Sequence, residues 1–192
     1  MRTIKLEDDA FPSQLRNIDD APKKLYIEGN LNNLYTNCIS IVGSRCCTEY
    51  GEKWCNIFAK ELVKYGITIV SGMAIGIDAV AHNAALQAGG KTIAVLPCGL
   101  KNIYPKQNIN IYQKILKSGG TVISEYSPKA SAGYNKYLER NRIVSGLSIA
   151  TLVVEAAHRS GTTVTARFAK EQGRDVYCIP RKPRQPKKHR NK

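Results

Sequence analysis

Polar and basic residues with phosphate-binding chemistry follow an apolar run near the start of the chain. Gly43, Ser44 and Arg45 come directly after the run 38–42, and Thr48 stands just before a segment with helical periodicity. A glycine lets the backbone approach a phosphate, the beginning of a helix offers unpaired N–H groups, and an arginine adds a bidentate contact. We therefore expect an anion site here. The alternative is a plain tight turn with a solvated arginine.

A second polar segment combines cationic and aromatic side chains. Lys101, Tyr104, Lys106 and Asn108 lie within residues 97–108, after another apolar run. Lysines bind phosphates, and a tyrosine ring offers a flat face on which an unpaired base stacks, which is the combination that single-stranded nucleic acid needs. In the alternative interpretation Tyr104 packs on the core and the lysines are only solvated. The composition favours contact with DNA.

Two further loops carry glycine or hydroxyl residues at an expected helix start. Gly72 lies in the loop 71–78, which matches neither G-x-G-x-x-G nor a P-loop, so we expect no nucleotide cofactor and only backbone donors to a phosphate. Ser160, Gly161 and Thr162 open a later helix. Helix capping alone explains those three residues as well as phosphate binding does.

Two arginines, Arg140 and Arg142, flank Asn141 just before another apolar run. A pair of this kind is ordinarily part of a solvated charge run. The residues alone therefore leave their role open, and the family resemblance described below is what favours a phosphate contact.

Catalytic and metal chemistry have little support in the residue pattern. Asp78 and His82 are one helical turn apart, but two side chains are too few for a closed zinc site, and a structural pair is the favoured interpretation. No two of the six cysteines have the C-x-x-C spacing, so we expect free thiols in a reducing compartment. We expect no metal and no catalytic residue.

Six short apolar runs would position these residues. Each is too short for a helix and rich in β-branched residues, and amphipathic segments such as the stripe Trp54, Phe58, Leu62 and Tyr65 lie between them. This alternation predicts an α/β fold with a doubly wound, mostly parallel sheet and helices on both faces. Ligands of such sheets bind beyond the carboxyl ends of the strands. The runs are 38–42, 67–70, 92–96, 122–124, 151–154 and 176–179.

The charge of the chain is unevenly distributed. The 29 Lys and Arg against 15 Asp and Glu give a net charge of +14, and an excess of this size favours polyanionic partners. Half of it lies in residues 181–192, which we expect to be a disordered basic tail, either a solvated end or a nonspecific phosphate-binding arm. Residues 1–37 are interpreted as an amino-terminal extension with one short strand, and residues 38–180 as the DNA-binding domain. With no signal peptide and no membrane span, we expect a cytoplasmic protein.

The ordered motifs resemble the DNA-processing protein A family (DprA, also called Smf). The resemblance covers residues from about 11 to 180 and rests on Gly43-Ser44-Arg45, Ser71-Gly72-x-Ala74-x-Gly76-Ile77-Asp78, Ala81-His82, Gly90-x-Thr92-Ile93-Ala94-Val95-Leu96, Gly99-Leu100, Tyr104-Pro105-x-x-Asn108, Ile123-Ser124-Glu125, Arg140-Asn141-Arg142-Ile143-Val144-Ser145-Gly146-Leu147, Val154-Glu155-Ala156, Ser160-Gly161-Thr162 and Glu171-Gln172-Gly173-Arg174.

The resemblance implies an extended Rossmann-like fold with a basic pocket for single-stranded DNA. It further implies protection of incoming strands during natural transformation, loading of the recombinase RecA, a homodimer, and no catalysis. Carried over by position, the Arg45 motif and the Gly72 loop form the pocket. Lys101, Lys106, Arg140 and Arg142 are then phosphate partners, and Tyr104 is a stacking platform. We expect no counterpart here to the amino-terminal helical domain and the winged-helix-like carboxyl domain of many family members.

Two alternatives share the predicted fold. A nucleotide phosphoribohydrolase of the Lonely-guy type would use the same phosphate-binding turns, but its motif resembles P-G-G-x-G-T-x-x-E, whereas here Glu155 precedes Ser160-Gly161-Thr162. A nucleotide-sensing protein would bind one nucleotide saturably and show no preference for long strands. Affinity that rises with oligonucleotide length distinguishes a DNA-binding protein from both.

Overall fold

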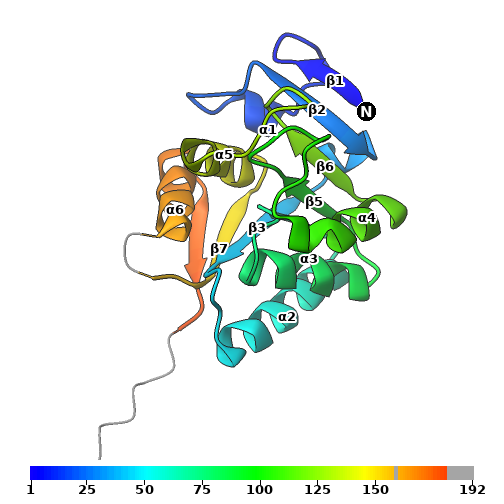
Figure 1. Ribbon diagram of the computed structural model, residues 1–192. Helices are drawn as coiled ribbons and strands as arrows, with labels where there is room; N and C mark the ends of the chain where they lie inside the picture. The colour runs from blue at the N-terminus through cyan, green and yellow to red at the C-terminus, as the bar shows by residue number, and fades with distance from the viewer. Residues whose placement is uncertain (158–159, 181–192) are drawn as a thin grey trace, which may run out of the picture.

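A single eight-stranded sheet forms the centre of the protein (Figure 1). The computed structural model describes residues 1–157 and 160–180. The strand order is β1-β2-β6-β5-β4-β3-β7-β8, and the six strands from β6 to β8 run parallel. The strands are β1 Arg2–Lys5, β2 Lys24–Gly29, β3 Cys38–Gly43, β4 Thr68–Ser71, β5 Thr92–Val95, β6 Thr121–Ser124, β7 Ala150–Glu155 and β8 Asp175–Cys178. The predicted doubly wound, mostly parallel sheet is confirmed.

Helices cover both faces of the sheet. Those on one face are α2, α3 and α4, and those on the other are α1, α5 and α6 (Figure 1). Their bounds are α1 Ser13–Arg16, α2 Glu49–Lys64, α3 Ile77–Gln87, α4 Ile109–Lys117, α5 Tyr134–Gly146 and α6 Gly161–Glu171, with 3-10 turns η1 Leu31–Tyr35 and η2 Lys106–Asn108. In the described ranges, none of the helices is long and apolar enough to cross a membrane.

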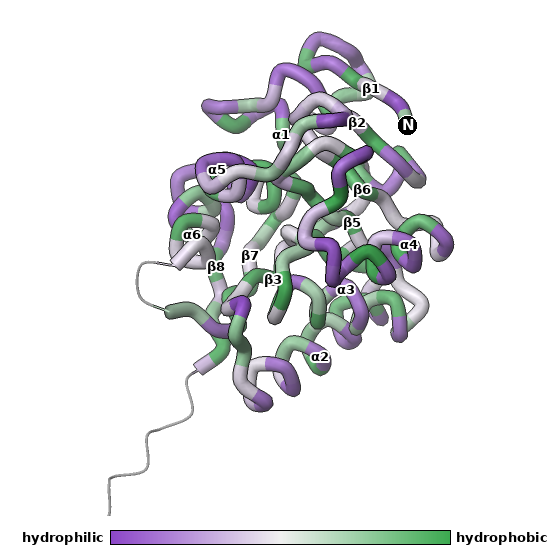
Figure 2. The backbone as a smooth tube through the Cα atoms, viewed as in Figure 1, coloured by the Kyte–Doolittle hydropathy of each residue, from purple (hydrophilic) through white to green (hydrophobic). Residues whose placement is uncertain are grey.

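Alternation along the strands divides the core between the two faces. Ile41 packs under α2 and α3, whereas its neighbour Val42 packs toward α5; Ile69 and Val70 divide in the same way. Both side chains of such a pair are buried because helices cover both faces, which is why the strands read as continuous apolar runs. Hydrophilic residues, purple in Figure 2, lie mostly along the outer loops and helix surfaces.

Helix α2 departs from the predicted stripe. It buries Cys55 and Ala59, while Phe58 is 38% exposed and Tyr65 is 81% exposed. The small side chains of α3 allow α2 to approach closely through its own small residues. Trp54 and Phe58 are therefore turned toward an apolar groove beside β8.

The amino-terminal segment contributes strands to the sheet. The sequence predicts one short strand before residue 38, and the structure has two, with β2 paired antiparallel to β6 and β1 paired to β2. Phe11 and Leu15 are buried in the same core cluster as Ile143 of α5. Strand β1 buries only Ile4 among its four residues, so its sequence carries no alternating apolar pattern. The basic segment 181–192 lies outside the described residues.

Candidate nucleic-acid interface

A cavity of about 670 Å³ opens where the direction of winding reverses. Strand β3 is the reversal point, because β4 follows on one side and β7 lies on the other. Loops at the carboxyl ends of such neighbouring strands diverge and leave a crevice, where doubly wound proteins bind ligands. Eight of the predicted site residues line it: Gly43, Ser44, Arg45, Gly72, Arg140, Ser160, Gly161 and Thr162.

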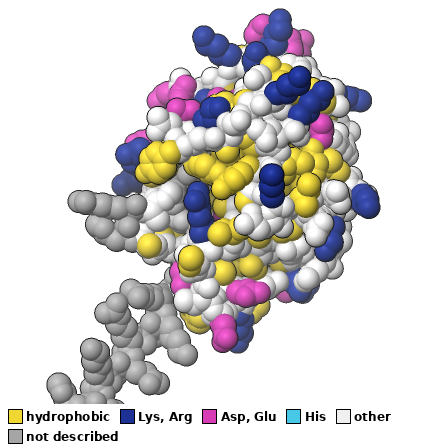
Figure 3. Space-filling model, in the orientation of Figure 1, with side chains coloured by type: hydrophobic (Ala, Val, Ile, Leu, Met, Phe, Trp, Pro, Cys, Tyr) yellow, Lys and Arg dark blue, Asp and Glu magenta, His cyan; other side chains and the backbone are white. Residues whose placement is uncertain are grey.

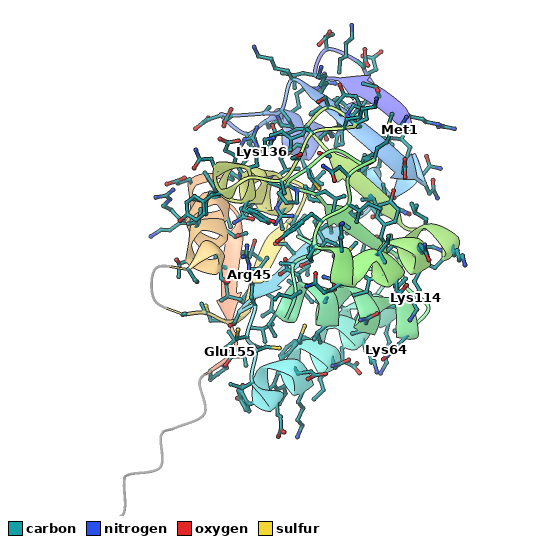
Figure 4. The ribbon with its side chains drawn as sticks, viewed as in Figure 1. Met1, Arg45, Lys64, Lys114, Lys136 and Glu155 are labelled. Carbon is teal, nitrogen blue, oxygen red and sulfur yellow. The ribbon has the colours of Figure 1, made fainter. Side chains whose placement is uncertain are left out.

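The Arg45 side chain stands over an aromatic surface. Its guanidinium lies 5.0 Å from the ring centre of Tyr137, and that ring meets Tyr104 edge to face at 6.1 Å. Figure 4 places Arg45 beside the end of β3, between the helices of the two faces. Burial, followed by the neighbouring Tyr104, raises the pKa of Tyr137 to about 12, so the ring stays neutral. A cation and two adjacent rings therefore border one opening.

Tyr134 and Tyr137 belong to the candidate site although their sequence context did not indicate it. Both line the cavity, and Tyr134 is 80% exposed. They lie three residues apart on α5, which puts them on one helical face. That spacing is visible in the sequence, but only the packing of α5 beside the cavity tells that the shared face meets Arg45.

The beginning of α6 forms the opposite wall of the cavity. Asn141 Nδ2 donates to the Gly161 carbonyl oxygen at 3.1 Å and so ties α6 to α5. The Ser160 Oγ atom is buried and has no hydrogen-bond partner in the described residues, and the Thr162 side chain is buried as well. The first turn of a helix carries unpaired N–H groups and a partial positive charge, so this wall suits an anionic group.

Arg140 lines the cavity from a buried position. Its side chain is 3% exposed and donates to the carbonyl oxygens of Gly72 and Val95. Burial lowers its pKa, and the nearby Asp78 carboxylate acts in the opposite direction. Much of its hydrogen-bonding capacity is thus used by the protein. Arg140 positions the Gly72 loop and adds positive charge at the bottom of the cavity.

The remaining predicted residues other than Arg142 lie between β5 and α4. Lys101, Tyr104 and Lys106 are all exposed, and Tyr104 reaches the cavity rim through its contact with Tyr137. Asn108 differs, because it is buried and its Nδ2 donates to the Met73 carbonyl oxygen at 2.8 Å. The structure therefore makes Asn108 an internal support of the Gly72 loop, in contrast to the DNA contact that the sequence suggests.

Arg142 does not join the other predicted residues at the cavity. Its Nη1 and Nη2 donate to the two carboxylate oxygens of Glu125 at 2.7 and 2.8 Å, and its Nε lies 2.9 Å from Asp20 Oδ2. The guanidinium is thus occupied by protein carboxylates and is buried. In place of the phosphate contact predicted for it, Arg142 ties the amino-terminal segment and β6 to α5.

Asp78 and His82 form separate buried contacts. Asp78 Oδ2 accepts from the Ala74 N–H at 3.3 Å, and burial raises its pKa. The Thr92 hydroxyl donates to the Ile69 carbonyl oxygen, so the His82 Nδ1–H donates to Thr92 Oγ1 at 2.7 Å. No three His, Cys, Asp or Glu side chains within residues 1–157 and 160–180 are placed to share a metal ion.

Because burial lowers the pKa of His82, we expect the stability of the protein to depend on pH. Burial, followed by the nearby Arg140 charge, lowers that pKa to about 3, against about 6.5 for an unfolded histidine. Between these two pH values the unfolded chain binds one more proton than the folded chain does. The stabilisation linked to a neutral His82 is therefore complete above pH 6.5 and is lost as the pH falls toward 3. Denaturant unfolding should show that the free energy of unfolding is about 2 kcal/mol lower at pH 5 than at pH 7, at about 1.4 kcal/mol per pH unit within this range. His82→Gln should reduce that loss, and an equal loss in both proteins would contradict the assignment.

Glu155, the acidic residue that precedes the Ser160-Gly161-Thr162 turn, has a structural contact. Its Oε2 accepts from the Thr48 N–H at 2.9 Å, at the beginning of α2. A carboxylate there stabilises the positive end of the helix. Glu155 does not line the cavity among the described residues.

Comparison with known proteins identifies relatives over almost the whole chain. The family model described as DNA recombination-mediator protein A matches residues 2–192. Protein Smf from Escherichia coli is 45% identical over 177 residues, which cover 92% of this chain and 47% of that protein. The chain thus spans about half the length of the first curated relatives it matches.

Two solved structures share both the fold and the sequence pattern. The X-ray structure of DNA processing protein A from Streptococcus pneumoniae has a TM-score of 0.90 and 41% identity, covering 94% of this chain and 63% of that one. The corresponding Helicobacter pylori protein, described for its single-stranded DNA binding mode, has a TM-score of 0.86 and 33% identity, with 96% and 84% covered. The chain therefore belongs to the DNA recombination-mediator protein A family.

Proposed function

We propose that this chain is a DNA-processing protein that binds single-stranded DNA in the cavity beyond β3 and β7. The observation that carries the proposal is the position of the exposed Arg45 guanidinium, 5.0 Å above the Tyr137 ring and on the wall of the same cavity as the start of α6. Cation, helix start and aromatic ring together match the parts of a nucleotide.

The two chemical components of the site have separate roles in this proposal. Arg45 and the N–H groups at the beginning of α6 bind phosphate oxygens, and Arg140 adds charge beneath them. Tyr137 and Tyr104 offer ring faces and edges to bases. Base stacking on an aromatic side chain contributes about 1–3 kcal/mol per base and tolerates any sequence.

This arrangement favours single strands over duplexes. Stacking needs a free base face, and in a duplex both faces of each base are covered by neighbouring pairs. The Helicobacter pylori relative, described for single-stranded DNA binding, and the recombination-mediator description of the family support the proposal. Protection of incoming strands, RecA loading, a homodimer and the absence of catalysis stay predictions from the resemblance.

Arg45→Ala tests the proposal most directly. A charge-assisted bidentate contact contributes about 1.5–3 kcal/mol, so affinity for single-stranded DNA should fall tenfold or more. The slope of log affinity against log salt should become shallower by about 0.7, the value for one phosphate contact on a single strand. Fluorescence anisotropy across a salt series measures both quantities.

Lys64→Ala is the matched control for this experiment. It removes the same charge from an exposed site on α2, well away from Arg45 in Figure 4, where Lys64 pairs with Glu61 at 2.6 Å. Its affinity and salt slope should equal those of the unmodified chain. Equal binding by the Arg45 and Lys64 variants would reject the cavity as the site.

A further inference from the structure

Two loops near the cavity are joined to each other by backbone hydrogen bonds. Residues 97–105 follow β5 and residues 126–133 follow β6, and we call them the paired loops. The Gly99 N–H donates to the Ala130 carbonyl oxygen at 2.9 Å, and the Lys101 N–H donates to that of Pro128 at 2.8 Å. A side chain at Gly99 would collide with the Pro128 carbonyl group, so the close approach depends on glycine.

The paired loops contain two lysines, Lys101 and Lys129, and no acidic residue. Glu125, which directly precedes the second loop, is bound by Arg142. Both lysines are exposed, and neither forms an ion pair with a carboxylate in the part of the chain that the structure describes. Lys64 on α2, by contrast, is neutralised by Glu61 at 2.6 Å.

A third lysine next to the paired loops has a different role. Lys136 Nζ donates to the Ser131 carbonyl oxygen at 2.8 Å and lies 5.1 Å from the ring centre of Tyr126. Asn102 Nδ2 adds a contact to Ser131 Oγ at 3.2 Å. These contacts hold residues 126–133 in place, so Lys101 and Lys129 project from a fixed base.

The paired loops continue the surface of the cavity. Tyr104 lies in the first loop and meets Tyr137, whose ring centre lies 5.0 Å from the Arg45 guanidinium. Figure 3 shows Lys and Arg side chains among exposed hydrophobic ones over the middle of this face. A strand that leaves the cavity past Tyr104 reaches the paired loops next.

We propose that the paired loops are a second contact segment for the same single strand, in which Lys101 and Lys129 bind phosphates of nucleotides that have left the cavity. The inference rests on the proposed function, because it needs a strand held at Arg45. It makes the site longer than the cavity, with the aromatic pair between two cationic ends. The second segment contributes only when the strand is long enough to reach it.

Strand length provides the test. We would measure binding of oligothymidine of about six and about sixteen nucleotides to the full chain and to Lys101→Ala/Lys129→Ala. Two lost phosphate contacts should lower affinity for the longer strand about tenfold and reduce its salt slope by about 1.4. Affinity for the shorter strand should stay within about twofold. Because both lysines are exposed, the melting temperature should not change.

The control variant is Lys114→Ala/Lys117→Ala, which removes the same charge from exposed positions on α4. An equal loss in the two double variants, or a loss that does not depend on strand length, would overturn the inference. Arg45→Ala distinguishes failure of this inference from failure of the proposed function, because that substitution should weaken binding of both the shorter and the longer oligonucleotide. If it weakens neither, the proposed site itself is wrong.

Discussion

Gly76→Ala should lower the free energy of unfolding by about 3 kcal/mol and also weaken binding of single-stranded DNA. Gly76 has φ of +79° and ψ of −134°, an extended backbone region with positive φ that is almost confined to glycine and costs another residue about 1–3 kcal/mol. A methyl carbon there would lie 2.6 Å from the Arg45 carbonyl oxygen and closer still to that of Ser44. Overpacking against backbone adds about 1–3 kcal/mol.

The effect on DNA binding follows from what the methyl group would displace. The Ile77 N–H donates to the Ser44 carbonyl oxygen at 3.1 Å, so the beginning of α3 holds the turn that carries Arg45. Moving that turn separates Arg45 from the Tyr137 ring. We expect affinity for a single strand to fall about tenfold, as for loss of the arginine contact itself.

Gly66→Ala is a matched control for this substitution. Gly66 also has a positive φ, +73°, but a methyl group there would meet no atom within 4 Å. It should cost only the conformational penalty, about 1–2 kcal/mol, with unchanged DNA affinity. Denaturant unfolding and anisotropy on the two variants separate strain from displacement. Similar losses of stability in both would show that the backbone collision is relieved elsewhere.

Arg142→Met should destabilise the fold by about 3–5 kcal/mol, which is the usual result of removing one partner from a buried ion pair. The Arg142 side chain is 7% exposed and that of Glu125 is 16% exposed. Methionine occupies similar space, so the main effect is an uncompensated carboxylate. The contact to Asp20, which holds the amino-terminal segment, is lost at the same time.

A second substitution identifies the cause of that loss. Arg142→Met/Glu125→Gln removes the unpaired charge, and its free energy of unfolding should recover by about 1–3 kcal/mol relative to the single variant. Arg142→Lys keeps a charge but loses the bidentate geometry, and it should retain DNA affinity once folded. If the Arg142→Lys protein were stable but bound DNA tenfold more weakly, the result would support the phosphate contact that the family resemblance predicts for Arg142.

Local chemistry explains why much of the fold was predictable. Runs of β-branched residues such as 38–42 and 151–154 became central strands, because a strand buried on both faces needs apolar side chains at every position. The position of the turn Gly43-Ser44-Arg45 at the site was predictable as well, since the residues after such strands meet at one edge of the sheet. The amino-terminal strand β1 was missed because only Ile4 in it is buried.

Residue types alone determined the fold class, the six strands β3 to β8 and the Arg45 turn, since these depend on neighbours within a few positions. Only the tertiary structure decided which basic and polar side chains remain available. A guanidinium binds a phosphate, a carboxylate or a carbonyl oxygen with the same donors. Arg140 donates to the carbonyl oxygen of Val95, 45 residues away, and Arg142 donates to the carboxylate of Glu125, 17 residues away. The Asn108 side chain likewise donates to the carbonyl oxygen of Met73, 35 residues away. Burial and distant partners separate Arg45, which faces the cavity, from arginines that hold the protein together.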